Sequence, residues 1–169
     1  MAAPTINHSV LVAYFKYLAD NLIGVNDFFR MNLMEIQGAF RSTAKFPCLV
    51  IEAHDGDYSG SNVMQSVNDR TFAFTVYAKP KKDDFDDQDT QLTLSEILGK
   101  KILARMRHDA TLSSHFLYNH FKASNVSYSK VGPIFNEKLY GYRFVGSITA
   151  PEPLIVNPAD WEDSPVICE

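Results

Sequence analysis

The chain has 169 residues, of which 46% are hydrophobic and 21% are charged, as is typical of one globular domain. These proportions exclude wholesale disorder, a collagen-like fibre and a long coiled coil. The 16 basic and 20 acidic residues give a net charge of −4, which argues against broad electrostatic binding to nucleic acid or an anionic membrane. The 12 Phe and 8 Tyr residues favour a substantial β-sheet.

The first apolar residues recur with the spacing of one face of an α-helix. They are Val10, Leu11, Tyr14, Phe15, Leu18 and Leu22. This pattern predicts a helix over residues 8–23 that stops at Gly24. No basic segment precedes it, so we interpret it as an amphipathic helix and not as a signal peptide. No stretch of the chain has the ~18–20 apolar residues of a membrane span.

The next segment predicts a short strand followed by a short helix. The aromatic residues at the start of the segment 28–31 favour the strand. Asn32 and Glu35 have the spacing of a helix N-cap and its capping-box partner. The apolar stripe of the predicted helix consists of Leu33, Ile36 and Phe40.

Two apolar runs in the middle of the chain predict a pair of antiparallel strands. Residues 46–52 form a short continuous apolar run, as in a buried strand. Residues 70–79 alternate, with Phe72, Phe74 and Val76 on one face. The residues between the two runs, 53–69, are rich in turn formers and have no period, which predicts a long loop.

A long helix is predicted over residues 88–108, after a densely charged segment. Thr93 and Glu96 match a capping box, although the acidic residues before them would also suit an earlier start. Ser95 and Gly99 lie one turn apart on the apolar face, where small side chains allow close approach to a neighbour. Because a helical glycine costs ~1 kcal/mol relative to alanine, we expect a packing reason for Gly99.

Three further elements and a tail complete the predicted order. Residues 114–121 indicate a short helix, and residues 123–131 and 139–151 indicate two strands. Beyond Pro151 the chain holds further prolines, several acidic residues and the only tryptophan, without any period. This composition predicts an extended arm and not a part of the core.

Strand pairs separated by helices indicate an α+β fold. We expect an antiparallel sheet of about four strands, with one long helix and one or two shorter helices on one face. Residues 1–150 are predicted to form a single α+β domain and residues 151–169 an extended, proline-rich acidic C-terminal arm. The predicted core between the sheet and the helices consists of Leu49, Ile51, Phe72, Phe74, Val76, Ile102, Met106 and Phe144.

One segment of the predicted loop carries residue types that bind metal ions. His54, Asp55 and Asp57 could supply ligands to a divalent ion, or a base for hydrolysis. The segment lacks the ligand series and the closing glutamate of a calcium loop, and Asp-Gly and Ser-Gly pairs are ordinary turn sequences. We therefore interpret it as a solvated loop.

The other residues with reactive side chains indicate no catalytic set. His108, His115 and His120 are spaced by seven and five residues, which does not place them on one helical face. Cys48 lies in an apolar run and is expected in the core. Both Cys48 and Cys168 are expected to be reduced thiols. Neither a phosphate-binding glycine loop nor a serine-nucleophile elbow occurs. We expect no enzymatic activity, no metal and no cofactor.

Two charged groups surround the predicted long helix. The acidic block consists of Asp83, Asp84, Asp86, Asp87 and Asp89. The basic group consists of Lys100, Lys101, Arg105 and Arg107. The acids suit a solvated loop before a helix N-terminus, or, in a ring, a channel or rim that repels a passing polyanion. The basic side chains suit a solvated face near the helix C-terminus, or a charged contact between subunits.

This order of elements resembles the small tail-completion or tail-terminator proteins of tailed bacteriophages and prophages. The resemblance lies in residues 46–52, 70–79 and 140–151, within an order that covers residues 8–156. It is architectural and contains no invariant motif.

The resemblance implies a structural, non-enzymatic virion protein. Such proteins form a homo-oligomeric ring, typically a hexamer, that caps the tail tube, stops its polymerisation and offers a docking surface to the head or neck. The implied partners are further copies of the chain, the tail tube protein and a neck or portal-side connector protein. DNA would contact the ring only in transit, and no membrane is involved. The implied location is the virion tail or neck, after synthesis in the bacterial host cytoplasm.

Other functions stay open at this point. Within the virion, the chain could be a neck or head-completion ring or a baseplate component. Outside it, the alternatives are a small metal-dependent hydrolase that uses His54 and Asp57, and an adaptor that binds a peptide by edge-strand addition.

Overall fold

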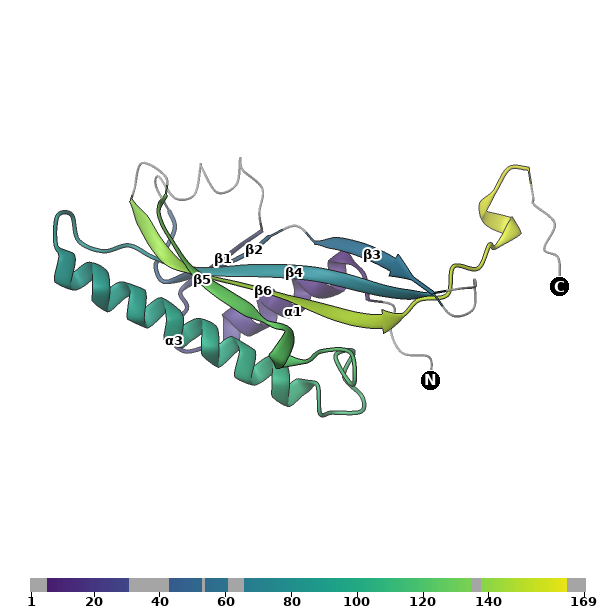
Figure 1. The fold of residues 1–169 in the computed structure, drawn as a ribbon. Helices are drawn as coiled ribbons and strands as arrows, with labels where there is room; N and C mark the ends of the chain where they lie inside the picture. The colour runs from purple at the N-terminus through teal and green to yellow at the C-terminus, as the bar shows by residue number, and fades with distance from the viewer. Residues whose placement is uncertain (1–5, 31–42, 53, 61–65, 135–137, 164–169) are drawn as a thin grey trace.

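The computed structural model describes residues 6–30, 43–52, 54–60, 66–134 and 138–163, and it has an α+β fold (Figure 1). The sheet is mixed and open and has six strands. Five of them follow one another in the order β1-β2-β4-β6-β5, and the sixth, β3, pairs with β4. Two α-helices, α1 and α3, lie on one face of this sheet and share a hydrophobic core with it. The predicted α+β class is therefore confirmed, but the prediction of an antiparallel sheet of about four strands is wrong.

Helix α1 spans His8–Asn21, close to the predicted 8–23. The Asn7 side chain caps its start by accepting a hydrogen bond from the Val10 backbone N–H at 3.0 Å. The helix ends because Leu22 adopts an extended backbone, and Gly24 then takes a φ of 102° that suits glycine. Its buried face packs against the sheet.

The short strand predicted over residues 28–31 is present as β1 (Asp27–Arg30). Its parallel pairing with β2 (Cys48–Ile51) was not predicted. A parallel pair needs a crossover connection, and residues 31–47 connect these two strands. The short helix predicted after β1 lies outside the described residues. Strand β2 then pairs antiparallel with β4 (Val67–Ala78), which confirms the predicted strand pair.

Strand β3 (Asp55–Ser59) occupies part of the segment that was predicted to be a loop. It pairs antiparallel with residues 67–71 of β4, next to the place where β2 pairs with residues 74–77. Every residue of β3 is exposed, so this strand has no hydrophobic alternation and only its backbone pairing defines it. Because of this pairing, β4 begins three residues before the predicted strand.

The second strand pair follows the prediction more closely. Strand β6 (Leu139–Pro151) has the predicted bounds and pairs with the whole length of β4. Strand β5 (Ser127–Ile134) begins four residues later than predicted and forms one edge of the sheet.

Residues 114–121 form successive turns and not the predicted short helix. The His115 imidazole accepts a hydrogen bond from the Leu117 backbone N–H at 3.2 Å, and Asn119 adopts a φ of 60°. Both features interrupt regular helical bonding. The apolar spacing arises because Leu117 and Phe121 are both buried. Phe121 also forms an isolated antiparallel β-bridge with Ile148 of β6.

Helix α3 spans Phe85–Asp109 and begins three residues earlier than predicted. Its N-cap is Asp84, whose carboxylate accepts a hydrogen bond from the Asp87 backbone N–H at 2.9 Å. Thr93 and Glu96, which were predicted to form a capping box, lie in the helix interior. The acidic residues thus begin the helix themselves, because carboxylates stabilise a helix N-terminus.

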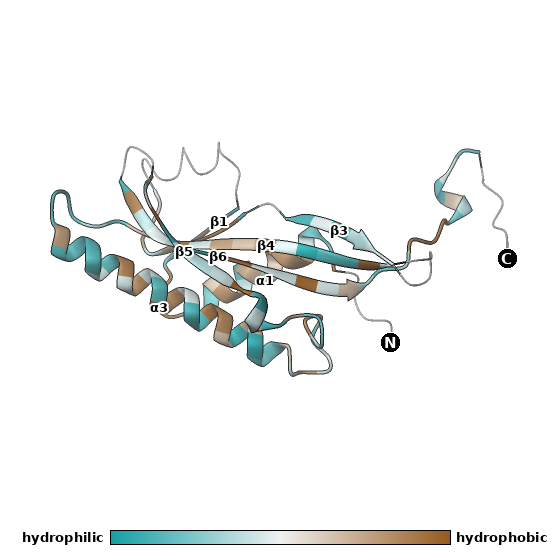
Figure 2. Cartoon of the chain, viewed as in Figure 1, coloured by the Kyte–Doolittle hydropathy of each residue, from teal (hydrophilic) through white to brown (hydrophobic). Residues whose placement is uncertain are grey.

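The main core lies between the helices and one face of the sheet (Figure 2). All eight residues predicted to form it are at most 1% exposed. A second, smaller cluster on the opposite face contains Phe29, Cys48, Val50, Tyr77 and Leu139. Cys48 is therefore a core residue, as predicted, and burial raises the pKa of its thiol well above the ordinary value.

Candidate functional site

The acidic block lies in the loop between β4 and α3 and in the first turns of that helix. Lys100 follows Asp86 on the same helix by about 21 Å along its axis, at 1.5 Å per residue. The structure therefore separates the two charged groups that the sequence singled out. It brings to Asp83 and Asp84 a different set of basic side chains instead.

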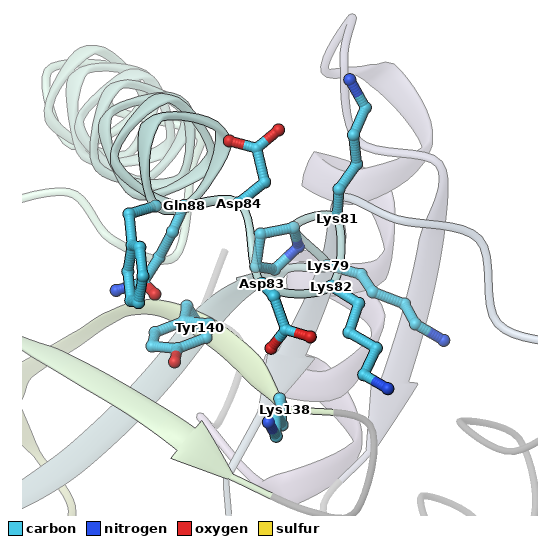
Figure 3. Close-up of a pocket in the computed structure, with 10 residues that line it drawn as sticks. Lys79, Lys81, Lys82, Asp83, Asp84, Gln88, Lys138 and Tyr140 are labelled. Carbon is cyan, nitrogen blue, oxygen red and sulfur yellow. The ribbon is translucent and has the colours of Figure 1, made fainter.

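A depression of about 370 Å³ lies beside this loop (Figure 3). We call it the lysine pocket, after the four lysines that line it together with Phe85 and Tyr140. The lining consists of Lys79, Pro80, Lys81, Lys82, Asp83, Asp84, Phe85, Gln88, Lys138 and Tyr140. Its residues come from the end of β4, the start of α3 and the start of β6, so the pocket lies at one end of the sheet.

The loop conformation holds the carboxylates of Asp84 and Asp87 beside the start of α3. Asp83 adopts a φ of 59°, and the turn it belongs to closes with a bond of 3.4 Å from the Asp84 N–H to the Lys81 carbonyl. Asp84 is engaged as the N-cap of α3. Asp87 accepts a bond of 2.7 Å from the Lys81 backbone N–H, and this bond lowers the pKa of the Asp87 carboxyl.

The lysines of the pocket are free to meet a partner. Lys79, Lys81, Lys82 and Lys138 are exposed, and within the described residues no side chain forms an ion pair with them. Phe85 is 79% exposed beside them. The lining contains no serine, cysteine or histidine. This arrangement can bind carboxylates next to an apolar or aromatic side chain.

Sequence reasoning missed this pocket as a unit. The KPKK run at residues 79–82 was a visible signal, but the aspartates directly after it dominated the interpretation. Lys138 and Tyr140 lie far away in the sequence and reach the loop only because β6 pairs with β4 in a register that aligns Tyr140 with Ala78.

The basic residues of α3 differ in their contacts. Lys100 forms an ion pair with Glu96 and lies 5.3 Å from the ring centroid of Tyr128. Arg105 donates to Asp109 at 2.8 Å and to the Tyr17 hydroxyl at 3.0 Å. Two of the four are thus held within the chain.

The remaining two basic residues of α3 are exposed. Lys101 lines a shallow depression of about 120 Å³ between α1 and α3, and Arg107 lies six residues further along α3. The role of this group as a partner contact stays a prediction.

Asp109 is the buried polar centre of the helical layer. It is 2% exposed, and it accepts hydrogen bonds from Arg105 and, at 2.8 Å, from the Tyr14 hydroxyl. Burial opposes its ionisation, but these bonds outweigh that effect and lower the pKa of the Asp109 carboxyl. Burial together with Asp109 raises the pKa of the Tyr14 hydroxyl. The group ties α1 to the end of α3.

The metal-binding candidates of the predicted loop lie at the start of β3. Asp55 and Asp57 are exposed, whereas the His54 ring contacts His8 with centroids 5.3 Å apart. Neither ring nitrogen of His54 has a hydrogen-bond partner in the described part of the chain. Burial of the ring is the main cause that lowers the pKa of His54, and the nearby charges of His8 and Arg70 lower it further.

Of the three later histidines, His108 and His115 both lie within 4.0 Å of Asp109, and His120 lies elsewhere. His108 lies 3.3 Å from Asp109, His115 packs against Tyr14 and Phe116, and His120 contacts the Thr149 carbonyl at 3.0 Å. Among the residues that the structure describes, no group of three or more His, Cys, Asp or Glu could hold a metal ion. No helix in the described ranges is long and apolar enough to span a bilayer.

Comparison of the chain with known protein families finds no family that matches, and comparison with curated proteins finds no similar protein.

Proposed function

We propose that the chain is a structural protein of a tailed-bacteriophage virion, a tail terminator or tail-completion protein. Six copies form a ring that caps the tail tube, stops its polymerisation and docks to the neck or to a portal-side connector. Support comes from the order of elements that carries the resemblance. A leading helix precedes β2 and β4, the long helix α3 follows, and β6 leaves the sheet into an arm.

The observation that carries the proposal is the composition of the arm. Residues 152–163 extend away from the end of the sheet without packing into its core (Figures 1 and 2). Four large apolar side chains of the arm are between 47% and 59% exposed: Leu154, Ile155, Val156 and Trp161. Such an exposed apolar segment marks a surface for protein–protein contact. A protein that assembles through repeated copies of itself would use it in every subunit.

The charge of the chain suits a conduit for DNA. In the proposed ring, the acidic block faces the central channel or the rim that contacts the tube, and the four lysines beside Asp83 and Asp84 face a neighbouring subunit. DNA that passes a wall of carboxylates is repelled and does not stick, whereas lysine or arginine there would bind phosphates through counterion release. The proposal gives the protein no catalytic role and no cofactor. A neck, head-completion or baseplate ring is the nearest alternative.

Deletion of the gene from its phage tests the terminator function. Without a cap, tail tubes should grow beyond their normal length and fail to join heads, as measured by electron microscopy of the lysate. Expression of the wild-type chain in trans should restore tails of normal length. Tails of normal length in the deletion would overturn the terminator function, and tails of normal length without heads would favour the neck alternative.

A further inference from the structure

The arm and the lysine pocket lie at opposite ends of β6. Tyr140 lines the pocket, and Pro151 begins the arm. The eleven residue steps between them span about 36 Å at 3.3 Å per residue. Figure 1 shows the arm leaving the sheet at the end away from the start of α3. Each copy therefore presents the arm and the pocket as two different surfaces at opposite ends of the sheet.

The root of the arm is fixed to the sheet. The Glu152 carboxylate accepts a bond of 2.6 Å from the Asn68 amide and forms an ion pair of 3.0 Å with Arg70. The Glu152 backbone N–H donates to the Ser66 carbonyl at 3.0 Å. These contacts hold the first residue after β6, so the apolar residues that follow start from a defined point and direction.

The arm and the pocket are complementary in charge. The arm carries Asp160, Glu162 and Asp163 around Trp161, and the sequence contains no basic residue after Arg143. The pocket carries four lysines against two aspartates, of which Asp84 is already engaged as a helix cap. Carboxylates of the arm would thus meet a surplus of ammonium groups.

The arm and the pocket also match in their apolar groups. Trp161 and the exposed Phe85 are aromatic, and a lysine ammonium over an indole ring adds a cation–π attraction. A depression of about 370 Å³ is near the lower end of the ~300–1,000 Å³ range of ligand sites, which suits one or two large side chains.

We propose that the arm of one copy docks into the lysine pocket of the next copy, with Trp161 in the pocket and the acidic residues beside it paired to its lysines. This inference rests on the proposed ring and names the contact that builds it. Because the two surfaces differ, the contact is head-to-tail, and a head-to-tail contact closes into a ring when its rotation closes.

Charge exchange tests this contact. One variant reverses the pocket (Lys79→Glu with Lys82→Glu), and another reverses the arm (Asp160→Lys with Glu162→Lys). Each variant alone should stay dissociated in light scattering under conditions in which the wild-type chain assembles. An equal mixture should assemble, because alternating copies then pair a reversed arm with a reversed pocket and a wild-type arm with a wild-type pocket. All changed residues are exposed, and circular dichroism checks that each variant is folded.

The only tryptophan of the chain provides a second readout. Trp161 emission should shift to shorter wavelength when the wild-type chain assembles and stay at long wavelength in the pocket variant. A control variant with Lys122→Glu and Lys130→Glu, two exposed lysines outside the pocket, should behave as the wild type.

The outcomes separate this inference from the proposed function. If the wild type assembles and the pocket variant assembles equally well with the same emission shift, the arm contact is overturned and the ring stands. If the mixture of the two variants fails to assemble while the wild type does, the contact is likewise overturned. If the wild type does not assemble at all, the ring itself fails.

Discussion

Gly99 of α3 lies directly against the ring of Phe144 on β6. A Cβ atom added to Gly99 would lie 2.0 Å from the Phe144 Cε2 atom and 2.4 Å from its Cζ atom. The glycine therefore lets the helix approach the sheet closely enough for Phe144 to fill the space under it. Ser95, one turn earlier, is fully buried and bonds its hydroxyl to the Gln91 carbonyl at 2.9 Å. The packing reason expected for these small residues is confirmed.

Gly99→Ala should destabilise the protein although alanine favours a helix. The propensity gain is ~1 kcal/mol, but overpacking of a tight core typically costs ~1–3 kcal/mol, and a contact this short belongs at the upper end. We expect a net loss of about 1–2 kcal/mol in the free energy of unfolding, measured by urea denaturation.

The change Ala104→Gly on the exposed face of α3 provides the control. It should lose only the ~1 kcal/mol of helix propensity. A Gly99→Ala variant that is more stable than the wild type would show that the helix and sheet are further apart than described here. In the background Phe144→Leu, the cost of Gly99→Ala should shrink, because the two side chains are in contact.

Phe74→Ala should cost ~3–5 kcal/mol, as other large-to-small changes in a core do. Phe74 is fully buried, with its ring centroid 5.0 Å from that of Phe144 and 5.4 Å from that of Phe15. The matched control is Phe85→Ala, because Phe85 is 79% exposed and should change the stability by no more than ~0.5 kcal/mol in the dissociated chain. Equal losses in both variants would refute the assigned strand register.

The stability of the protein should fall as the pH decreases below the usual histidine pKa of 6.5. Burial, His8 and Arg70 lower the pKa of His54, while Asp55 opposes them, and burial also lowers the pKa of His115. The unfolded chain then binds more protons than the folded chain in this interval, so the unfolding free energy rises with pH.

His54→Gln removes one of these titrating groups. The loss of unfolding free energy between about pH 7.5 and about pH 5.5 should therefore be smaller in the variant than in the wild type. Urea denaturation at the two pH values measures the difference, and His120→Gln is the control, because it removes a histidine from a different place in the fold, beside the Thr149 carbonyl. Equal losses in the wild type and in His54→Gln would mean that His54 accepts a proton as easily in the folded state as in the unfolded state.

Replacement of Asp83, Asp84, Asp86 and Asp87 by asparagine should leave the fold intact. Asparagine is as good an N-cap as aspartate, so position 84 keeps its bond to the Asp87 backbone N–H. The side-chain oxygen at position 87 can still accept from the Lys81 N–H. In the proposed ring, the loss of four negative charges should nonetheless impair head joining or DNA ejection.

Infectivity in a complementation assay measures the effect of the four asparagines. The control replaces Asp55 and Asp57, two exposed carboxylates of β3, by asparagine and should retain full infectivity. Full infectivity of the four-asparagine variant would leave these aspartates with the role of starting α3 and nothing more.

Hydrophobic periodicity predicted the parts of the fold that bury apolar side chains. It gave the bounds of β6, the helix α1 to within two residues and all eight core positions. It missed β3, because a strand whose residues are all exposed has no apolar face. It also missed the parallel pairing of β1 with β2, since pairing direction depends on how the connection crosses the sheet and not on side-chain pattern.

In the candidate sites, too, features formed by neighbouring residues could be predicted from the sequence, whereas contacts between distant residues could not. The acidic block was visible as a local charge run, and so was its ability to begin a helix. The lysine pocket was not visible, because Lys138 and Tyr140 join the loop only through the register of β6 on β4. Asp109 was missed for a similar reason, since its partner Tyr14 is 95 residues away in the sequence.

The mass of the assembled chain tests the central claim most directly. Native mass spectrometry of the full wild-type chain at micromolar concentrations should show one dominant species of six subunits, and negative-stain images of the same sample should show rings with a central hole. A chain that stays monomeric from nanomolar to high micromolar concentrations would contradict the account.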